Sequence, residues 1–249
     1  MKRLIAFDLD GTLAESKQPL SAETGDLLAR LLQVADVAVI SGGDWPQFEK
    51  QVAACLPDDA RRDRLWLMPT TGTKLYRFGE GAWKAIYADL FDTAEKNAIL
   101  AAFEHALAAA GLADERIWGE RIEDRGSQIT FSGLGQDAPL EAKEAWDPDR
   151  AKRTALQKTL IAALPQLSIK LGGTTSIDVT RAGVDKGYGL KRLADTSGVN
   201  LEDMLFLGDA IYPGGNDYPA FEIGLDTVRV RDVAETTAVV SGIIACLKP

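Results

Sequence analysis

Residues 3–13 read Arg-Leu-Ile-Ala-Phe-Asp-Leu-Asp-Gly-Thr-Leu, a short apolar run that ends in two acidic residues and a turn. An apolar run of this length, closed by polar residues, is typical of a parallel strand that is buried on both faces. Asp8 and Asp10 fall at the end of that strand, on the same side of an extended backbone. Two charges that follow a buried strand need a partner, so this stretch predicts a functional site at a strand end.

The segments that follow alternate between strand and helix. Ser21 begins a capping signal, which predicts a helix directly after it. Apolar runs at residues 37–40 and 65–68 predict two further buried strands, and residues 45–56 predict a helix between them. Strands that alternate with helices are the signature of an α/β fold with a doubly wound, parallel sheet.

The pattern changes near residue 82 and returns after Lys186. Between these points the sequence predicts a mixture of helices and half-buried antiparallel strands, with helices at 93–110 and 150–164 and strands at 116–118, 127–133, 168–171 and 176–180. After Lys186 it predicts a helix to 196, a strand at 204–207 and a helix near 233–247. We therefore expect a core built from residues 1–82 and 186–249, into which residues 83–185 are inserted as an α+β domain.

Composition and charge exclude several classes of protein. The 249 residues carry a formal charge of −9, which argues against general binding to nucleic acids or anionic membranes. A single histidine excludes a multi-histidine metal site. No apolar run approaches the ~20 residues of a membrane helix, and the N-terminus turns acidic before a secretory core forms. We expect a cytoplasmic protein.

Polar groups follow three of the expected strands, in residues 8–13, residues 41–44 and the stretch from Gly208 to Asp217. The carboxyl ends of strands in a doubly wound sheet form the ligand crevice, so these groups are expected to converge. Clustered carboxylates repel one another, and a hard divalent cation relieves that repulsion. Ligands that are all oxygen atoms favour Mg²⁺ over zinc.

With Mg²⁺ bound, one carboxylate can attack phosphorus and form an aspartyl phosphate. A second carboxylate can protonate the leaving oxygen and then deprotonate the next nucleophile. The Asp-x-Asp spacing of Asp8 and Asp10 suits both tasks. The pair therefore predicts phosphoryl-transfer chemistry.

A phosphate group also needs donors and a positive charge. Thr12 offers a hydroxyl or an amide N–H, and Ser41 with the amide of Gly42 can bind another phosphate oxygen. Lys186 lies where the α/β pattern resumes and is expected to neutralise the remaining charge.

The order of these motifs resembles that of the haloacid dehalogenase superfamily, whose four motifs correspond here to residues 7–13, Ser41, Lys186 and residues 208–209. The resemblance implies that Asp8 is the nucleophile and Asp10 the general acid and base. It implies that Ser41 and Lys186 bind phosphate, and that the insertion is a large α+β cap.

The resemblance also defines a metal site. It implies that Mg²⁺ is held by Asp8, Asp209 and the backbone carbonyl of Asp10. Asp217, which follows in the same stretch as Asp209, completes the set of expected ligands.

Within that superfamily the sequence resembles the phosphomannomutase family of eukaryotes, in residues 123–132, 172–179, 184–190 and 206–218. By position, the resemblance implies that Arg125, Ser176 and Asp178 contact the sugar or its distal phosphate. It also allows dimerisation through the cap.

Two positions depart from that family. Gln136 and Lys143 stand at or near positions where the family has arginines. Arginine grips phosphate through two parallel hydrogen bonds, which glutamine and lysine cannot reproduce. A mutase must retain a phosphate at the cap, so a weaker grip favours hydrolysis.

We therefore expect a Mg²⁺-dependent phosphatase that acts on a phosphorylated sugar. The first alternative is a phosphomannomutase that interconverts hexose 6- and 1-phosphates. The second is a phosphosugar-binding protein without turnover, and a signalling-type phosphoacceptor domain is a weaker alternative because it leaves the cap without a purpose.

Overall fold

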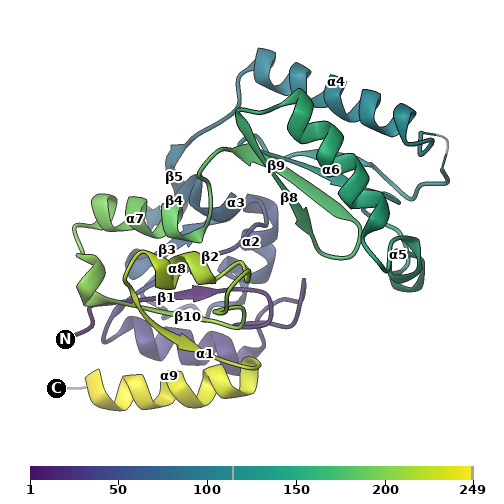
Figure 1. Cartoon of the computed structure of the whole chain (residues 1–249). Coiled ribbons are helices and arrows are strands. Elements are labelled where there is room, and N and C mark those ends of the chain that lie inside the picture. The colour runs from purple at the N-terminus through teal and green to yellow at the C-terminus, as the bar shows by residue number, and fades with distance from the viewer. Residues whose placement is uncertain (114, 248–249) are drawn as a thin grey trace. The chain divides into compact units, whose positions relative to one another are not determined.

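The computed structural model describes residues 1–113 and 115–247 and divides into two compact units (Figure 1). The core unit comprises Met1–Ala88 and Asp185–Pro249. The inserted unit comprises Asp89–Val184. The division lies close to the two points at which the sequence pattern changes.

A seven-stranded sheet forms the centre of the core unit, in the order β11-β10-β1-β2-β3-β4-β5. The first five strands in this order run parallel, whereas β4 and β5 are antiparallel to their neighbours. The strands are β1 (Leu4–Asp8), β2 (Asp36–Ile40), β3 (Leu65–Met68), β4 (Lys74–Gly79), β5 (Ala82–Ala88), β10 (Met204–Gly208) and β11 (Asp226–Arg229). The expected α/β fold is confirmed.

Helices cover both faces of this sheet (Figure 1). Along β1, Ile5 and Phe7 belong to one buried cluster, and Leu4 and Ala6 belong to another. Because side chains alternate along a strand, the two clusters lie on opposite faces. The first includes residues of α1 (Ala22–Leu32) and α9 (Val233–Leu247), and the second includes residues of α7 (Lys186–Ser197) and α8 (Tyr218–Glu222).

The β4–β5 hairpin corrects the expected boundary of the core. Residue 83 was expected to begin the insertion, but it lies in β5, which hydrogen-bonds to β4. Glu80 and Gly81 form the two-residue loop between the strands, and both have positive φ, at 52° and 79°. Such loops match the twist of a hairpin, so the chain returns to the core sheet once more before the insertion begins.

The inserted unit contains a four-stranded antiparallel sheet in the order β6-β7-β9-β8. Its strands are β6 (Ile122–Asp124), β7 (Gln128–Ser132), β8 (Leu167–Gly172) and β9 (Ser176–Arg181), and its helices are α4 (Thr93–Ala109), α5 (Leu140–Trp146) and α6 (Ala151–Ala163). Figure 1 shows α4 and α6 on one face of this sheet. The strand expected at residues 116–118 is wrong, because that segment is irregular and the first strand is β6.

Short helices complete the core unit. They are α2 (Trp45–Gln51) and α3 (Pro69–Gly72), with 3₁₀ turns at Ala53–Cys55, Arg62–Arg64 and Leu201–Asp203. The helix expected at 45–56 therefore ends at Gln51 and continues as a 3₁₀ turn. Among the described residues, no helix combines the length and the apolar character needed to span a bilayer.

Candidate active site

The carboxyl ends of the parallel strands bring the expected core residues to one edge of the sheet. Asp8 ends β1, Ser41 follows β2, and Asp209 follows β10. These three strands are direct neighbours in the order β10-β1-β2. Parallel strands of one sheet lie about 4.8 Å apart, so residues more than 160 positions apart in sequence lie close together at this edge, as the doubly wound pattern predicts.

Lys186 lies between two carboxylates. Its ammonium group donates hydrogen bonds to Asp8 and to Asp217, and all three side chains are buried. Lys186 begins α7, whose N-cap Asp185 accepts a hydrogen bond from the amide of Tyr188 at 2.8 Å. The cap fixes the first turn of the helix, and with it the position of the lysine.

Three carboxylates form a group that fits a divalent cation. Asp8, Asp209 and Asp217 each offer an oxygen atom, and these atoms lie within 4.8 Å of one another. Ligands on opposite sides of Mg²⁺ are about 4.2 Å apart, because each Mg–O bond is about 2.1 Å. The donor set is therefore of the right chemistry and nearly the right size for Mg²⁺. The structure brings together three of the four expected metal ligands through their side chains.

Two glycines make room for these carboxylates. A Cβ atom on Gly11, which has φ +86°, would lie 2.7 Å from Oδ2 of Asp209. A Cβ atom on Gly208 would lie 2.4 Å from Oδ2 of Asp217. Oδ2 of Asp217 also accepts a hydrogen bond from the amide of Ala210 at 3.0 Å. Backbone approaches this close require glycine. Gly11 and Gly208 therefore allow the carboxylates of Asp209 and Asp217 to lie directly against the backbone.

The charges of this group perturb one another. Burial raises the pKa of Asp8 from 3.8 to about 6, although the charge of Lys186 opposes the shift. Burial would lower the pKa of Lys186, but Asp8 and Asp217 raise it above its usual value. Burial and the neighbouring Asp217 raise the pKa of Asp209. Added positive charge would favour the ionised form of each carboxyl group.

Asp10 lies outside the group of three carboxylates. Its Oδ1 accepts a hydrogen bond of 2.6 Å from the amide of Lys17, whose φ is 60°. The residue is partly exposed.

The expected phosphate-binding residues differ in their environments. Ser41 is buried, and its hydroxyl lies 3.5 Å from the amide nitrogen of Gly43. The Thr12 hydroxyl is buried without a hydrogen-bond partner among the described residues. Its amide donates to the carbonyl of Leu9 at 3.3 Å. Gly42 follows Ser41 directly at the carboxyl end of β2.

In the inserted unit, Asp178 lies on the polar face of the sheet. Its carboxylate accepts hydrogen bonds from Thr130 at 2.7 Å and from Gln128 at 3.0 Å. Burial raises the pKa of Asp178, and the charge of Arg125 opposes this effect. Arg125 pairs with Glu123 at 2.7 Å. Arg125 and Asp178 thus belong to one electrostatic cluster.

The remaining expected substrate residues lie toward one end of the same sheet. Ser176 begins β9 opposite Ser132, whose hydroxyl donates to the carbonyl of Gly135 at 3.0 Å. The ammonium of Lys143 donates to the backbone carbonyl of Gln136, seven residues earlier in the chain, at 2.8 Å. The Gln136 side-chain nitrogen is buried without a hydrogen-bond partner in the described part of the chain.

One turn at the sheet edge was missed from the sequence. Residues Thr70, Thr71 and Gly72 follow β3 with three successive positive φ angles of 48°, 59° and 80°. The polar stretch after an expected strand was the available signal.

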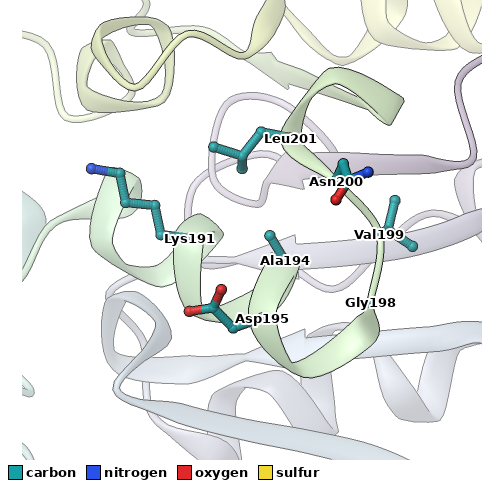
Figure 2. Close-up of a pocket in the computed structure, with 7 residues that line it drawn as sticks. All are labelled: Lys191, Ala194, Asp195, Gly198, Val199, Asn200 and Leu201. Carbon is teal, nitrogen blue, oxygen red and sulfur yellow. The ribbon is translucent and has the colours of Figure 1, made fainter.

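The pocket in Figure 2 lies at the end of α7 and contains none of the expected site residues. It is lined by Lys191, Ala194, Asp195, Gly198, Val199, Asn200 and Leu201.

Comparison with known proteins gives two consistent results. Two phosphomannomutases are similar in sequence: that of Dendrobium officinale is 25% identical, over 93% of this chain and 91% of its own length. That of Schizosaccharomyces pombe is 26% identical, over 88% of this chain and 85% of its own.

Solved structures share the fold. The N-terminally truncated IMP-nucleotidase of Plasmodium falciparum has a TM-score of 0.70 at 17% identity, covering 99% of this chain and 71% of its own. The trehalose-6-phosphate phosphatase of Aspergillus fumigatus has a TM-score of 0.60 at 18% identity. The match covers 98% of this chain and 93% of the phosphatase chain.

A family profile decides the classification. The family described as "Eukaryotic phosphomannomutase" matches residues 24–243, which is most of the chain. This agrees with the group of three carboxylates and with an α/β core that carries an inserted α+β unit. The chain therefore belongs to the eukaryotic phosphomannomutase family, and it is a phosphotransferase of the haloacid dehalogenase superfamily.

Proposed function

We propose that this protein is a phosphatase that hydrolyses the phosphate ester of a phosphorylated sugar through a covalent phosphate on Asp8. The contact of Lys186 with Asp8 and Asp217, beside Asp209, supports this proposal most directly. A buried nucleophilic carboxylate next to a fixed ammonium group is suited to attack on an anionic phosphate.

In the first step, a carboxylate oxygen of Asp8 forms a bond to phosphorus, and the bond from phosphorus to the ester oxygen breaks. Asp10 gives a proton to the departing oxygen, which leaves as an alcohol. The amide of Lys17, at 2.6 Å from Oδ1 of Asp10, orients the acid for this transfer.

In the second step, a water oxygen attacks the phosphorus of the aspartyl phosphate. Asp10 takes the proton from this water, inorganic phosphate leaves, and the carboxylate of Asp8 is restored. Mg²⁺, held by Asp8, Asp209, Asp217 and the backbone carbonyl of Asp10, would supply positive charge against the phosphate oxygens.

Donors on the other side of Asp8 would bind the transferred group. Ser41 and the amide of Gly42 are assigned to phosphate oxygens, as is the hydroxyl of Thr12, which is buried and lacks another partner among the described residues. Lys186 provides the positive charge.

The inserted unit is assigned to substrate recognition, with Arg125, Ser176 and Asp178 as contacts to the sugar. Gln136 and Lys143 favour hydrolysis over isomerisation, because they bind a retained phosphate group more weakly than arginines would. The ammonium of Lys143 is hydrogen-bonded to a backbone carbonyl, and Gln136 is uncharged. Neither provides the bidentate positive fork with which an arginine retains a phosphate.

The alternative is a phosphomannomutase, which is favoured by family membership and by the sequence relatives. A phosphorus NMR time course with mannose 1-phosphate and glucose 1-phosphate, with and without a hexose bisphosphate, separates the two. A phosphatase releases inorganic phosphate from both esters without the bisphosphate. Conversion to the 6-phosphate that requires the bisphosphate and releases little phosphate would favour the mutase.

The same experiment on Asp8→Asn provides the control. This variant keeps the size of the side chain but removes the nucleophile, so it should lose product formation by at least about a thousandfold. Ligand-induced thermal stabilisation of the wild type without any turnover would instead identify a phosphosugar-binding protein.

A further inference from the structure

The turn after β3 is conformationally strained. Thr70 and Thr71 have φ angles of 48° and 59°, and both are β-branched residues in the left-handed region. Such residues rarely adopt this conformation, and it persists only where surrounding contacts impose it. Strain of this kind is concentrated at functional sites, which makes the turn a candidate for a role in catalysis or recognition.

Contacts from two directions hold the turn in place. The amides of Thr70 and Thr71 donate to the carbonyls of Gly43 and Ser41, at 2.8 and 2.9 Å. On the other side, a Cβ atom on Gly72 would lie 2.6 Å from Cα of Gly189 in α7. The turn is therefore joined to the loop after β2 and packed against the helix that begins with Lys186.

The hydroxyl groups of the two threonines differ in burial and in hydrogen bonding. The Thr70 hydroxyl is fully buried and accepts a hydrogen bond from the Thr73 hydroxyl at 2.7 Å. Thr71 is partly exposed, and among residues 1–113 and 115–247 its hydroxyl has no hydrogen-bond partner. Its Oγ1 lies 4.0 Å from the point where a Cβ atom on Gly42 would be. The strained backbone thus presents a partly exposed, unused hydroxyl beside the loop assigned to phosphate.

The order of the strands indicates which part of a substrate this hydroxyl can reach. Asp8 ends β1, and Thr71 follows β3, which is two strands away in the order β1-β2-β3. Two strand spacings correspond to roughly 10 Å. This exceeds the width of one phosphate group, and Ser41 lies between the two positions.

We propose that Thr71 determines specificity by hydrogen-bonding to a hydroxyl group on the leaving group of the phosphate ester. This rests on the proposed phosphatase function. The residue acts on the sugar portion of the substrate, while Ser41 and Lys186 act on its phosphate.

Two substrates test this role. Mannose 1-phosphate has a leaving group rich in hydroxyls, whereas p-nitrophenyl phosphate has an aromatic leaving group with none. Thr71→Val removes the hydroxyl and keeps the β-branched shape. It should lower kcat/KM for mannose 1-phosphate by about tenfold and leave that for p-nitrophenyl phosphate within about twofold.

Thr73→Val is the matched control, because it removes a hydroxyl from the same turn that is already bonded to Thr70. It should change stability without changing the ratio of the two kcat/KM values. Equal losses for both substrates in Thr71→Val, or no loss for either, would overturn the proposal.

Absence of turnover in the wild type with both esters would count against the proposed function itself. Thr71 is then tested in the Asp8→Asn background by the thermal shift that mannose 1-phosphate induces. Addition of Thr71→Val should weaken the apparent affinity by about tenfold, and an unchanged affinity would overturn the assignment of Thr71.

Discussion

The ammonium group of Lys186 is hydrogen-bonded to the carboxylate of Asp8, although the two residues are 178 positions apart in the chain. The same ammonium contacts Asp217, so that one buried cation serves two buried anions. The contact joins the first strand of the core to the helix that follows the insertion. It links the nucleophile assigned to catalysis with the stability of the core.

The first prediction concerns removal of this cation. Lys186→Met keeps the length of the side chain but leaves Asp8 and Asp217 buried and facing each other without compensation. We expect a loss of about 3–5 kcal/mol in the free energy of unfolding, measured with urea in the presence of EDTA at pH 8. The loss should be smaller at pH 5, where Asp8 is protonated.

Lys191→Met is the control, because Lys191 lies on the same helix but is exposed. It should change stability by less than about 0.5 kcal/mol. Equal effects of the two substitutions would contradict the importance of the buried contact.

The second prediction concerns pH. The pKa of Asp8 is raised to about 6 in the folded protein, from 3.8. As pH rises from about 4 to about 6, the carboxyl group of Asp8 loses its proton in the unfolded chain before it does so in the folded protein. The free energy of unfolding therefore falls. The fall across this window should amount to roughly 2 kcal/mol, given about 1.4 kcal/mol per pKa unit and a titration that is incomplete at both ends of the window.

Asp8→Asn provides the reference, because asparagine does not titrate. Urea unfolding of both proteins in EDTA should show the wild type losing stability relative to Asp8→Asn across this window, with no further relative change above pH 7. Excess Mg²⁺ should shift the window to lower pH, because the cation favours the ionised carboxylate. A difference that stays constant from pH 4 to pH 8 would refute the raised pKa.

Most of the core could be predicted from sequence because buried parallel strands are continuous apolar runs. Residues 4–8 and 65–68 are strands, as expected, and both are fully buried. The helix after Ser21 begins where its capping signal predicts. Strand ends converge in any doubly wound sheet, so the meeting of Asp8 with Asp209 followed from topology.

The remainder depended on contacts between distant residues. The hairpin of β4 and β5 was missed because its outer strand is largely exposed and lacks the apolar run of a central strand. The strain at Thr71 has no signature in the sequence, because threonine does not favour positive φ. It is imposed by Ser41 and Gly43, whose carbonyls accept hydrogen bonds from the turn.

The third prediction concerns Mg²⁺. Asp209→Asn removes one charge from the group of three carboxylates, so we expect Mg²⁺ affinity to fall by at least about tenfold in isothermal titration calorimetry. Asp226→Asn is the control, because the Asp226 side chain is 72% exposed and pairs with Lys2. Asp226 begins β11, at the opposite edge of the sheet from the strand ends that carry Asp8 and Asp209. If both variants bind Mg²⁺ as tightly as the wild type, the cation lies elsewhere.

The fourth prediction concerns the backbone that makes room for the cation. Gly11→Ala places a methyl group 2.7 Å from Oδ2 of Asp209, at a residue whose φ is +86°. The carboxylate must move, and left-handed alanine costs about 1–2 kcal/mol. We expect Mg²⁺ affinity to fall by at least about tenfold, together with this loss of stability.

Gly242→Ala is the control. It lies at an exposed position of α9 with no atom within 4 Å of the added Cβ, so it should instead stabilise the protein by about 0.5–1 kcal/mol. Mg²⁺ titration and urea unfolding of both variants measure the two effects separately. Unchanged Mg²⁺ affinity in Gly11→Ala would mean that Asp209 can move without losing the ion.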